Sequence, residues 1–231
     1  MLRPRLGVHA KGAEMARRTK EDAEATRNRL LDAAQEVFHV KGVRGASLLD
    51  VAQAASLTRG AIYWHFKDKA DLFDAMMQRV TLPFEQACFP ELDGSGNQTS
   101  ALQGILDVLQ MVLHSVNTDA AIRSVFDIAL YKVECVGEML AVRERRMMGV
   151  MRFTSRLEGA LVLAAEQAGV DLPISAASAA IGLHAVFNGI LHAWLLHDAR
   201  PFDLEREGMT AVAVYLKGLG LGVEKKLCES F

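Results

Sequence analysis

The stretch Ser47–Lys69, SLLDVAQAASLTRGAIYWHFKDK, has the length and the capping residues of two short helices joined by a tight turn. Ser47 stands three residues before Asp50, which is the spacing of a capping box at a helix N-terminus. After the turn, Thr58 is placed to cap a second short helix over residues 59–66. The stretch therefore predicts a helix-turn-helix in which residues 59–66 form the recognition helix.

The flanking segments complete a three-helix module. Residues 22–41 place apolar side chains on one face of an amphipathic helix, and Gly42 follows as a stop signal. On the other side, a second capping arrangement starts a helix near Lys69, which runs towards Cys88 with Pro83 inside it. We expect this fourth helix to connect the module to the rest of the chain.

Helical periodicity continues through the second half, and no segment alternates convincingly with the period of two typical of a strand. After a loop at residues 90–100, the expected helices cover residues 101–116, 119–131, 137–168, 174–197 and 203–219. The predicted fold is all-α, with an N-terminal three-helix module and a C-terminal helical bundle. The expected division is a disordered extension over residues 1–16, the helix-turn-helix domain over 17–69 and the bundle domain over 70–231.

Composition and charge narrow the function. The 231 residues are 51% hydrophobic with only 5 Pro, which excludes a disordered or collagen-like chain. Residues 1–80 hold 14 Lys and Arg against 10 Asp and Glu, whereas the remainder holds 12 against 18. This asymmetry of charge favours an N-terminal module that binds a polyanion. Three scattered cysteines form no CxxC pair, so a reducing cytoplasm fits better than a disulfide framework or a thiolate zinc site.

Two other functional classes find little support. Residues 172–197 are long enough to span a bilayer and carry no formal charge, but their Ser, His and Asn residues favour a helix buried in protein and no membrane partner. The sequence has no GxSxG, no P-loop, no metal-ligand cluster and no recognisable catalytic pair of acidic residues. We therefore expect neither an enzyme nor a cofactor.

The recognition helix carries an unusual set of side chains. Ile62 and Phe66 are one turn apart and can face the core of the module, which directs Arg59, Tyr63 and Trp64 elsewhere. DNA would cover such a surface, because Arg pairs with guanine edges and aromatic rings lie against sugars and thymine methyl groups. In the alternative, Tyr63, Trp64 and also His65 pack within the module.

Residues 17–80 resemble the DNA-binding module of TetR-family transcriptional repressors, and TRGAIYWHFKDKADLF at residues 58–73 matches the signature of that family. The phrase TRGAIYWHF is most similar to the branch that represses multidrug efflux pump operons. The resemblance implies a homodimer on a palindromic DNA operator, with each third helix in the major groove. The implied DNA contacts are Arg44, Ser47, Thr58, Arg59, Gly60, Ala61, Tyr63, Trp64, His65, Lys67 and Lys69, with a basic arm at Arg17, Arg18 and Lys20 nearby.

One departure from the family pattern is visible in the turn. Ser56 and Leu57 stand where many members have Gly-Val. We therefore expect this turn to form without the positive φ that glycine supplies. The flanking caps and the core residues of the third helix should preserve the motif.

Semi-polar residues on otherwise apolar helices point to a ligand cavity in the C-terminal domain. Such a cavity suits a small hydrophobic or aromatic inducer, and an endogenous metabolite or acyl chain is the alternative. The predicted ligand-binding residues are Phe84, Cys88, Gln110, Met111, His114, Ile128, His184, Phe187, Asn188 and His192. Each polar residue could instead be a satisfied core residue. A zinc site from His184, His192 and His197 is disfavoured by their spacing, so no metal is expected.

The last two long helices also suit a dimer interface. Small residues at Ala176, Ala177, Ala179, Ala180 and Gly182 permit close helix approach. Bulky apolar surface would come from Trp194, Leu195, Val212, Tyr215, Leu216 and Leu219. The alternative is that these residues form the core of the monomer.

Overall fold

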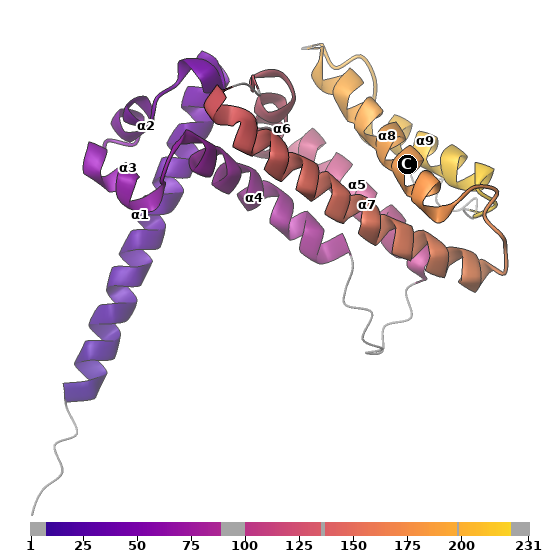
Figure 1. The fold of residues 1–231 in the computed structure, drawn as a ribbon, viewed down its shortest axis with the longest axis horizontal. Coiled ribbons are helices and arrows are strands. Elements are labelled where there is room, and N and C mark those ends of the chain that lie inside the picture. The colour runs from indigo at the N-terminus through magenta and orange to yellow at the C-terminus, as the bar shows by residue number, and fades with distance from the viewer. Residues whose placement is uncertain (1–7, 89–99, 135–136, 198, 223–231) are drawn as a thin grey trace, which may run out of the picture. The chain divides into compact units, whose positions relative to one another are not determined.

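The computed structural model describes residues 8–88, 100–134, 137–197 and 199–222, and the secondary structure in these ranges is entirely helical (Figure 1). The chain divides into two compact units, Met1–Met76 and Met77–Phe231. The predicted all-α fold, with a helix-turn-helix module followed by a helical bundle, is confirmed.

The first unit contains α1 (Val8–Gly45), α2 (Leu48–Ala54), α3 (Arg59–His65) and the start of α4 (Lys69–Cys88). Helix α1 begins well before the expected residue 22, so residues 8–16 of the expected disordered extension are helical, whereas residues 1–7 lie outside the described part. Gly42 interrupts α1 with φ 68° and ψ 161°, as its role of stop signal requires.

Apolar side chains from all four helices form the core of the first unit. Leu30, Leu31 and Phe38 of α1 are fully buried, and the Phe38 ring lies 6.3 Å from that of Phe73 on α4. Ile62 of α3 is also fully buried. Each such side chain contributes about 1.5–3 kcal/mol when it leaves water. The short helices α2 and α3 therefore depend on this shared core, since helices of this length are unstable alone.

The turn between α2 and α3 differs from the expectation. Ser56 has a φ of 54°, so the turn uses the left-handed conformation although no glycine is present. The amide of Ser56 donates to the Gln53 carbonyl at 2.9 Å, and that of Leu57 donates to the Ala52 carbonyl at 2.8 Å. This bond pattern ends α2 and reverses the chain. It holds Ser56 in a conformation that costs a residue with a side chain roughly 1–2 kcal/mol.

The second unit contains the later part of α4, then α5 (Ala101–Thr118), α6 (Ala120–Tyr131), the 3₁₀ turn η1 (Gly137–Met139), α7 (Leu140–Ala168), α8 (Ala176–Leu195) and α9 (Leu204–Gly218). Side chains cap four of these helices at their N-termini, namely Ser100, Asp119, Ser175 and Asp203. Helix α7 ends at Gly169, whose φ of 66° is the left-handed C-terminal conformation.

Within this unit α8 packs between α7 and α9, and α5 packs against α6, α7 and α9 (Figure 1). Gly182 lets Tyr215 of α9 approach the backbone of α8, where the Tyr215 hydroxyl donates to the Ala179 carbonyl at 3.1 Å. Gly208 of α9 similarly admits Leu113 of α5, since a Cβ at this glycine would lie 2.6 Å from a Leu113 methyl group.

This packing corrects the expected dimer surface. Trp194, Val212, Leu216 and Leu219 are at most 4% exposed, and Ala179 and Ala180 are likewise buried. These residues form the core of the chain itself, which was the alternative considered from sequence. The apolar stripe of α9 is thus satisfied by α5 and α8 and is not a free surface.

Candidate functional site

Helix α3 is short and held at both ends. The Thr58 hydroxyl accepts a hydrogen bond from the Ala61 amide at 3.3 Å, as expected for the predicted cap. At the other end Phe66 leaves the helix in an extended conformation and is only 2% exposed. With Ile62 fully buried as well, one face of α3 is fixed to the core. Its other residues are turned outward.

The outward face of α3 is aromatic and cationic. Tyr63 is 50% exposed and Trp64 is 73% exposed, which contradicts the alternative that they pack within the module. The Arg59 guanidinium lies over the Tyr63 ring, 5.5 Å from its centroid, and both side chains are accessible. Gly60 beside them is exposed, and a Cβ there would make only ordinary contact with the Thr58 hydroxyl. A large exposed aromatic surface beside an Arg is typical of a surface that contacts a partner.

His65 lies between the core and this surface. Its ring is half-buried and meets the Trp64 ring edge-on at 4.5 Å between centroids. Burial, together with the positive charge of Arg27, lowers the pKa of His65. The imidazole is therefore neutral at pH 7 and can offer a hydrogen bond but not a charge.

The start of α2 is built by a network of three side chains. The Ser47 hydroxyl donates to the Asp50 carboxylate at 2.6 Å and accepts from the Asp50 amide at 3.1 Å, so the predicted capping box is present. Lys41 pairs with the same carboxylate at 2.6 Å, and hydrogen bonds from Lys41 and Ser47 hold the pKa of Asp50 well below its usual range. Because the hydroxyl of Ser47 already serves the helix cap, a contact of this hydroxyl with DNA, as the resemblance implies, requires it to exchange partners.

Lys67 and Lys69 have different environments. Lys67 lies beyond the end of α3, and its side chain is exposed. Its backbone amide donates to the Asp71 carboxylate at 3.0 Å, which fixes the backbone at this surface position. The Lys69 ammonium instead donates to the carbonyls of Arg44 and Ala46, at 3.2 and 3.0 Å. In the structure Lys69 thus joins the start of α4 to the end of α1, a role in the fold that the implied DNA contact did not include.

Two arginines of α1 support this surface and were missed from the sequence. Arg29 donates to the Ala55 carbonyl at 2.8 Å and so caps the end of α2. The guanidinium of Arg27 lies over the Phe66 ring, 5.3 Å from its centroid. Both belong to an amphipathic helix whose cations look like ordinary solvated residues, so only the folded geometry distinguishes them.

The predicted ligand-binding residues do not all share one environment. Phe84, Ile128 and Phe187 are buried, whereas Gln110 and Met111 are partly exposed. The side chain of Cys88 lies outside the described part.

Two of the predicted histidine contacts lie on the surface. His114 is exposed and its Nδ1 lies 3.1 Å from the Glu205 carboxylate, which also accepts from Asn117 at 2.9 Å. His192 is exposed as well, and its ring and carbonyl both meet the Tyr131 hydroxyl, at 2.9 and 2.7 Å. The expectation that these histidines line a cavity is not met, since each joins two helices at their surface.

His184 and Asn188 are the predicted pair that the structure brings together. The side-chain nitrogen of Asn188 lies 2.7 Å from Nε2 of His184 and 3.1 Å from the His184 carbonyl oxygen. The ring of Phe153 from α7 lies 5.6 Å from the imidazole. Burial lowers the pKa of His184. This half-buried group between α7 and α8 is thus neutral, polar and flanked by an aromatic ring.

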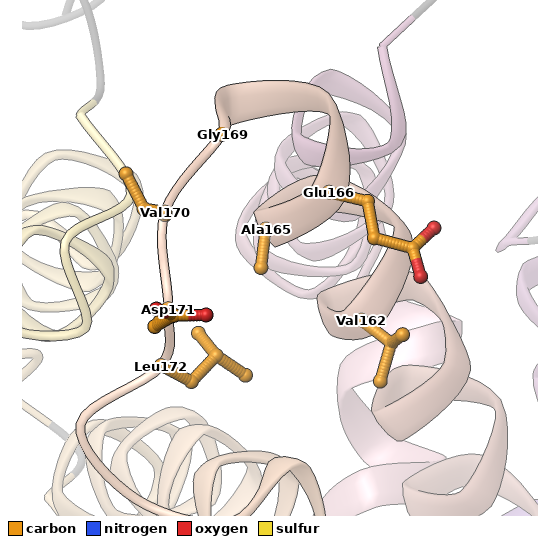
Figure 2. A pocket seen from close by; sticks show the side chains of 7 residues that line it. All are labelled: Val162, Ala165, Glu166, Gly169, Val170, Asp171 and Leu172. Carbon is orange, nitrogen blue, oxygen red and sulfur yellow. The ribbon is translucent and has the colours of Figure 1, made fainter.

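A pocket of about 390 Å³ is lined by the end of α7 and by the loop that follows it (Figure 2). Its lining residues are Val162, Ala165, Glu166, Gly169, Val170, Asp171 and Leu172. None of them was predicted to bind ligand. In the described part of the chain no group of three or more His, Cys, Asp or Glu residues is arranged to hold a metal ion.

The fold and the outward face of α3 define a helix-turn-helix DNA-binding protein of the transcription-regulator class. Residues 30–76 match the family model of bacterial regulatory proteins of the tetR family, and residues 100–221 match the C-terminal region of MAATS-type transcriptional repressors. The chain is 35% identical over 210 residues to the HTH-type transcriptional regulator AcrR of Shigella flexneri, an alignment that covers 88% of this chain and 93% of the relative. The chain belongs to the TetR family.

Solved structures agree with this assignment. NalD, the secondary repressor of the MexAB-OprM multidrug efflux pump in Pseudomonas aeruginosa, superposes with a TM-score of 0.75 at 33% identity, covering 85% of this chain and 98% of NalD. SmeT of Stenotrophomonas maltophilia, solved in complex with triclosan, gives 0.72 at 31% identity, covering 84% and 90% of the two chains. These relatives are consistent with the efflux-repressor branch that the signature indicated.

Proposed function

We propose that this chain is a cytoplasmic, ligand-responsive repressor. It would bind a palindromic operator as a homodimer and control a multidrug efflux operon. The observation that carries the proposal is the outward face of α3, where Arg59, Tyr63 and Trp64 are exposed together on a helix anchored by Ile62. Arg59 would pair with a guanine edge, and the aromatic rings would lie against sugars and thymine methyl groups. Lys67, just beyond the helix, would contact a phosphate.

Dimerisation would use the side of α8 that the chain leaves uncovered. Helix α8 has a mean hydropathy of 1.3. By length and composition only, it is the one helix among the described residues that could cross a membrane. Only 28% of its apolar stretch is buried within the chain. The sequence had favoured a helix surrounded by protein. Ile181 is 63% exposed, Ala185 and Gly189 follow at one-turn spacing, and Val214 of α9 is 67% exposed. A second copy of the chain would cover this face, in line with the homodimer that the family resemblance implies.

The inducer would act through α4, whose residues Lys69–Cys88 begin in the first unit and end in the second. Pro83 removes one helical hydrogen bond from this element and so supplies a point of bending. A ligand that favours one bend over another would change the position of the recognition helices relative to the major grooves. A coupling free energy of about 1–3 kcal/mol would change operator affinity about 5- to 150-fold.

The test is reciprocity between the two ligands. Triclosan, which the relative SmeT binds, serves as the probe, and its affinity is measured with and without saturating operator DNA. Because coupling is reciprocal, operator DNA should weaken triclosan binding by the same factor by which triclosan weakens operator binding. Equal triclosan affinities in the two conditions would contradict the proposal that a bound inducer releases the operator.

A further inference from the structure

The tautomer of His184 follows from its contacts with Asn188. The Asn188 amide nitrogen donates to the His184 carbonyl oxygen at 3.1 Å, and because a carbonyl can only accept, the orientation of the amide is determined. The same nitrogen lies 2.7 Å from Nε2 of the imidazole, so Nε2 must accept. A neutral imidazole with an accepting Nε2 carries its proton on Nδ1. His184 therefore has a fixed donor, Nδ1–H.

This donor has no hydrogen-bond partner among the described residues, and neither does the side-chain oxygen of Asn188. Both residues are half-buried, and no fully buried side-chain nitrogen or oxygen in the described part lacks a partner. The two atoms are thus within reach of another molecule. The Phe153 ring, with its centroid 5.6 Å from that of the imidazole and tilted at 50° to it, provides an apolar neighbour for the His184 ring.

The other two histidines predicted as ligand contacts offer no comparable donor. Nδ1 of His114 is held by the Glu205 carboxylate, and Nδ1 of His192 is held by the Tyr131 hydroxyl. Both side chains are also exposed, where water competes for any hydrogen bond. His184 alone among the three combines partial burial, a defined tautomer and an unused N–H.

We infer that His184 selects the inducer: the site between α7 and α8 takes neutral, ring-bearing molecules whose carbonyl or phenolic oxygen accepts a hydrogen bond from Nδ1. This inference rests on the proposed function, because it names the ligand class of the inducer site. A ring lacking the acceptor would cover Nδ1–H and leave it unpaired, which is the situation that polar sites discriminate against most strongly. The ring itself would pack against Phe153.

A matched pair of probes tests the inference. 1-Acetylnaphthalene and 1-isopropenylnaphthalene have the same shape, but the first has a carbonyl oxygen where the second has a CH₂ group. Dissociation constants are measured for the full chain by titration calorimetry. One hydrogen bond of about 1–1.4 kcal/mol predicts that the wild type binds the ketone roughly 5- to 10-fold more tightly.

Variants assign that preference to the pair of residues. His184→Phe keeps a ring against Phe153 but removes the donor, so the ratio of the two affinities should fall to about one. Asn188→Leu keeps the imidazole but removes the amide that selects its tautomer, so the ratio of the two affinities should become smaller. This second variant keeps the test valid if His184→Phe does not fold. His192→Phe is the control on the same helix and should keep the wild-type ratio.

The outcomes separate the inference from the proposed function. Equal affinities in the wild type, no binding of either naphthalene, or a ketone preference that survives in both variants at the 184–188 pair would overturn the inference. If the preference is found and lost as expected, but the bound ketone leaves operator affinity unchanged, then the inference holds and the inducer role in the proposed function fails.

Discussion

Gly60 and Trp64 are two residues of α3 that the fold itself does not explain. Trp64 is 73% exposed, although burying such a ring would stabilise the module. Gly60 has no neighbour that would collide with a Cβ, so packing within the protein does not require a glycine there. Both residues are explained if another molecule lies against α3. A glycine then allows the backbone to approach it closely.

Gly60→Ala should therefore separate stability from binding. The free energy of unfolding should stay equal or rise by up to about 1 kcal/mol, because alanine loses less backbone entropy in a helix. Operator affinity should fall, since the new methyl group lies on the contacting face. Urea titration and fluorescence anisotropy measure the two effects. A variant that binds operator as tightly as the wild type would show that nothing approaches Gly60 closely.

His184 predicts a dependence of stability on pH. Burial lowers its pKa below the ordinary value of 6.5, so the unfolded chain takes up a proton at a pH where the folded chain does not. This contribution to stability is fully present above the unfolded pKa and is lost as the pH falls through the folded one. Between about pH 7.5 and about pH 5, the wild type should lose more unfolding free energy than His184→Phe. Equal losses in urea titrations would contradict this account.

At the scale of elements, local sequence signals predicted the helices well because caps act over a few residues. Ser47 with Asp50, and Thr58, are found at the helix ends that their chemistry indicated. The turn at Ser56 was wrongly expected to avoid positive φ, because two backbone hydrogen bonds override the preference of serine. The start of α1 at Val8 could not be predicted, because the sequence there has no strong capping residue and no clear apolar periodicity.

Helix packing gives a prediction at the same scale. At Gly182 a Cβ would overlap the Tyr215 hydroxyl, so Gly182→Ala should separate α8 from α9 and cost about 1–3 kcal/mol. Gly159 of α7 is the matched control, because it is exposed inside a helix with nothing within 4 Å of a Cβ. Gly159→Ala should be neutral or stabilising by up to about 1 kcal/mol. Thermal unfolding that shows equal effects for the two variants would contradict the packing described.

At the scale of the whole molecule, the sequence predicted the family and the fold, but it did not predict which apolar helix faces are buried within the chain and which are exposed. Periodicity shows that a helix has an apolar face, but it does not say which helix covers that face. Trp194 and Val212 were therefore candidates for an interface and proved to be core. The pairing of His114 with Glu205 joins residues 91 positions apart, a separation at which no local pattern operates. The apolar outer side of α8 became visible only in the folded chain.

That uncovered side predicts the oligomeric state. The wild type should sediment as a dimer at micromolar concentration, and Ile181→Glu should shift it to monomer because a carboxylate would be buried without a partner in the interface. Val40→Glu is the control, since Val40 is 82% exposed on α1. If the wild type is already monomeric, or if Ile181→Glu remains dimeric, α8 is not the dimer surface.

The outward face of α3 is expected to read DNA sequence, and one comparison of variants tests this expectation. Binding of the wild type, Arg59→Ala and Lys67→Ala is measured by anisotropy over a range of salt concentrations, on an operator selected from a random duplex pool and on a scrambled duplex. Arg59→Ala should lose about 1–3 kcal/mol on the operator with little change on scrambled DNA. Lys67→Ala should weaken both duplexes alike and reduce the salt slope by about one. If Arg59→Ala weakens binding to the operator and to the scrambled duplex equally, then Arg59 on α3 does not read the DNA sequence.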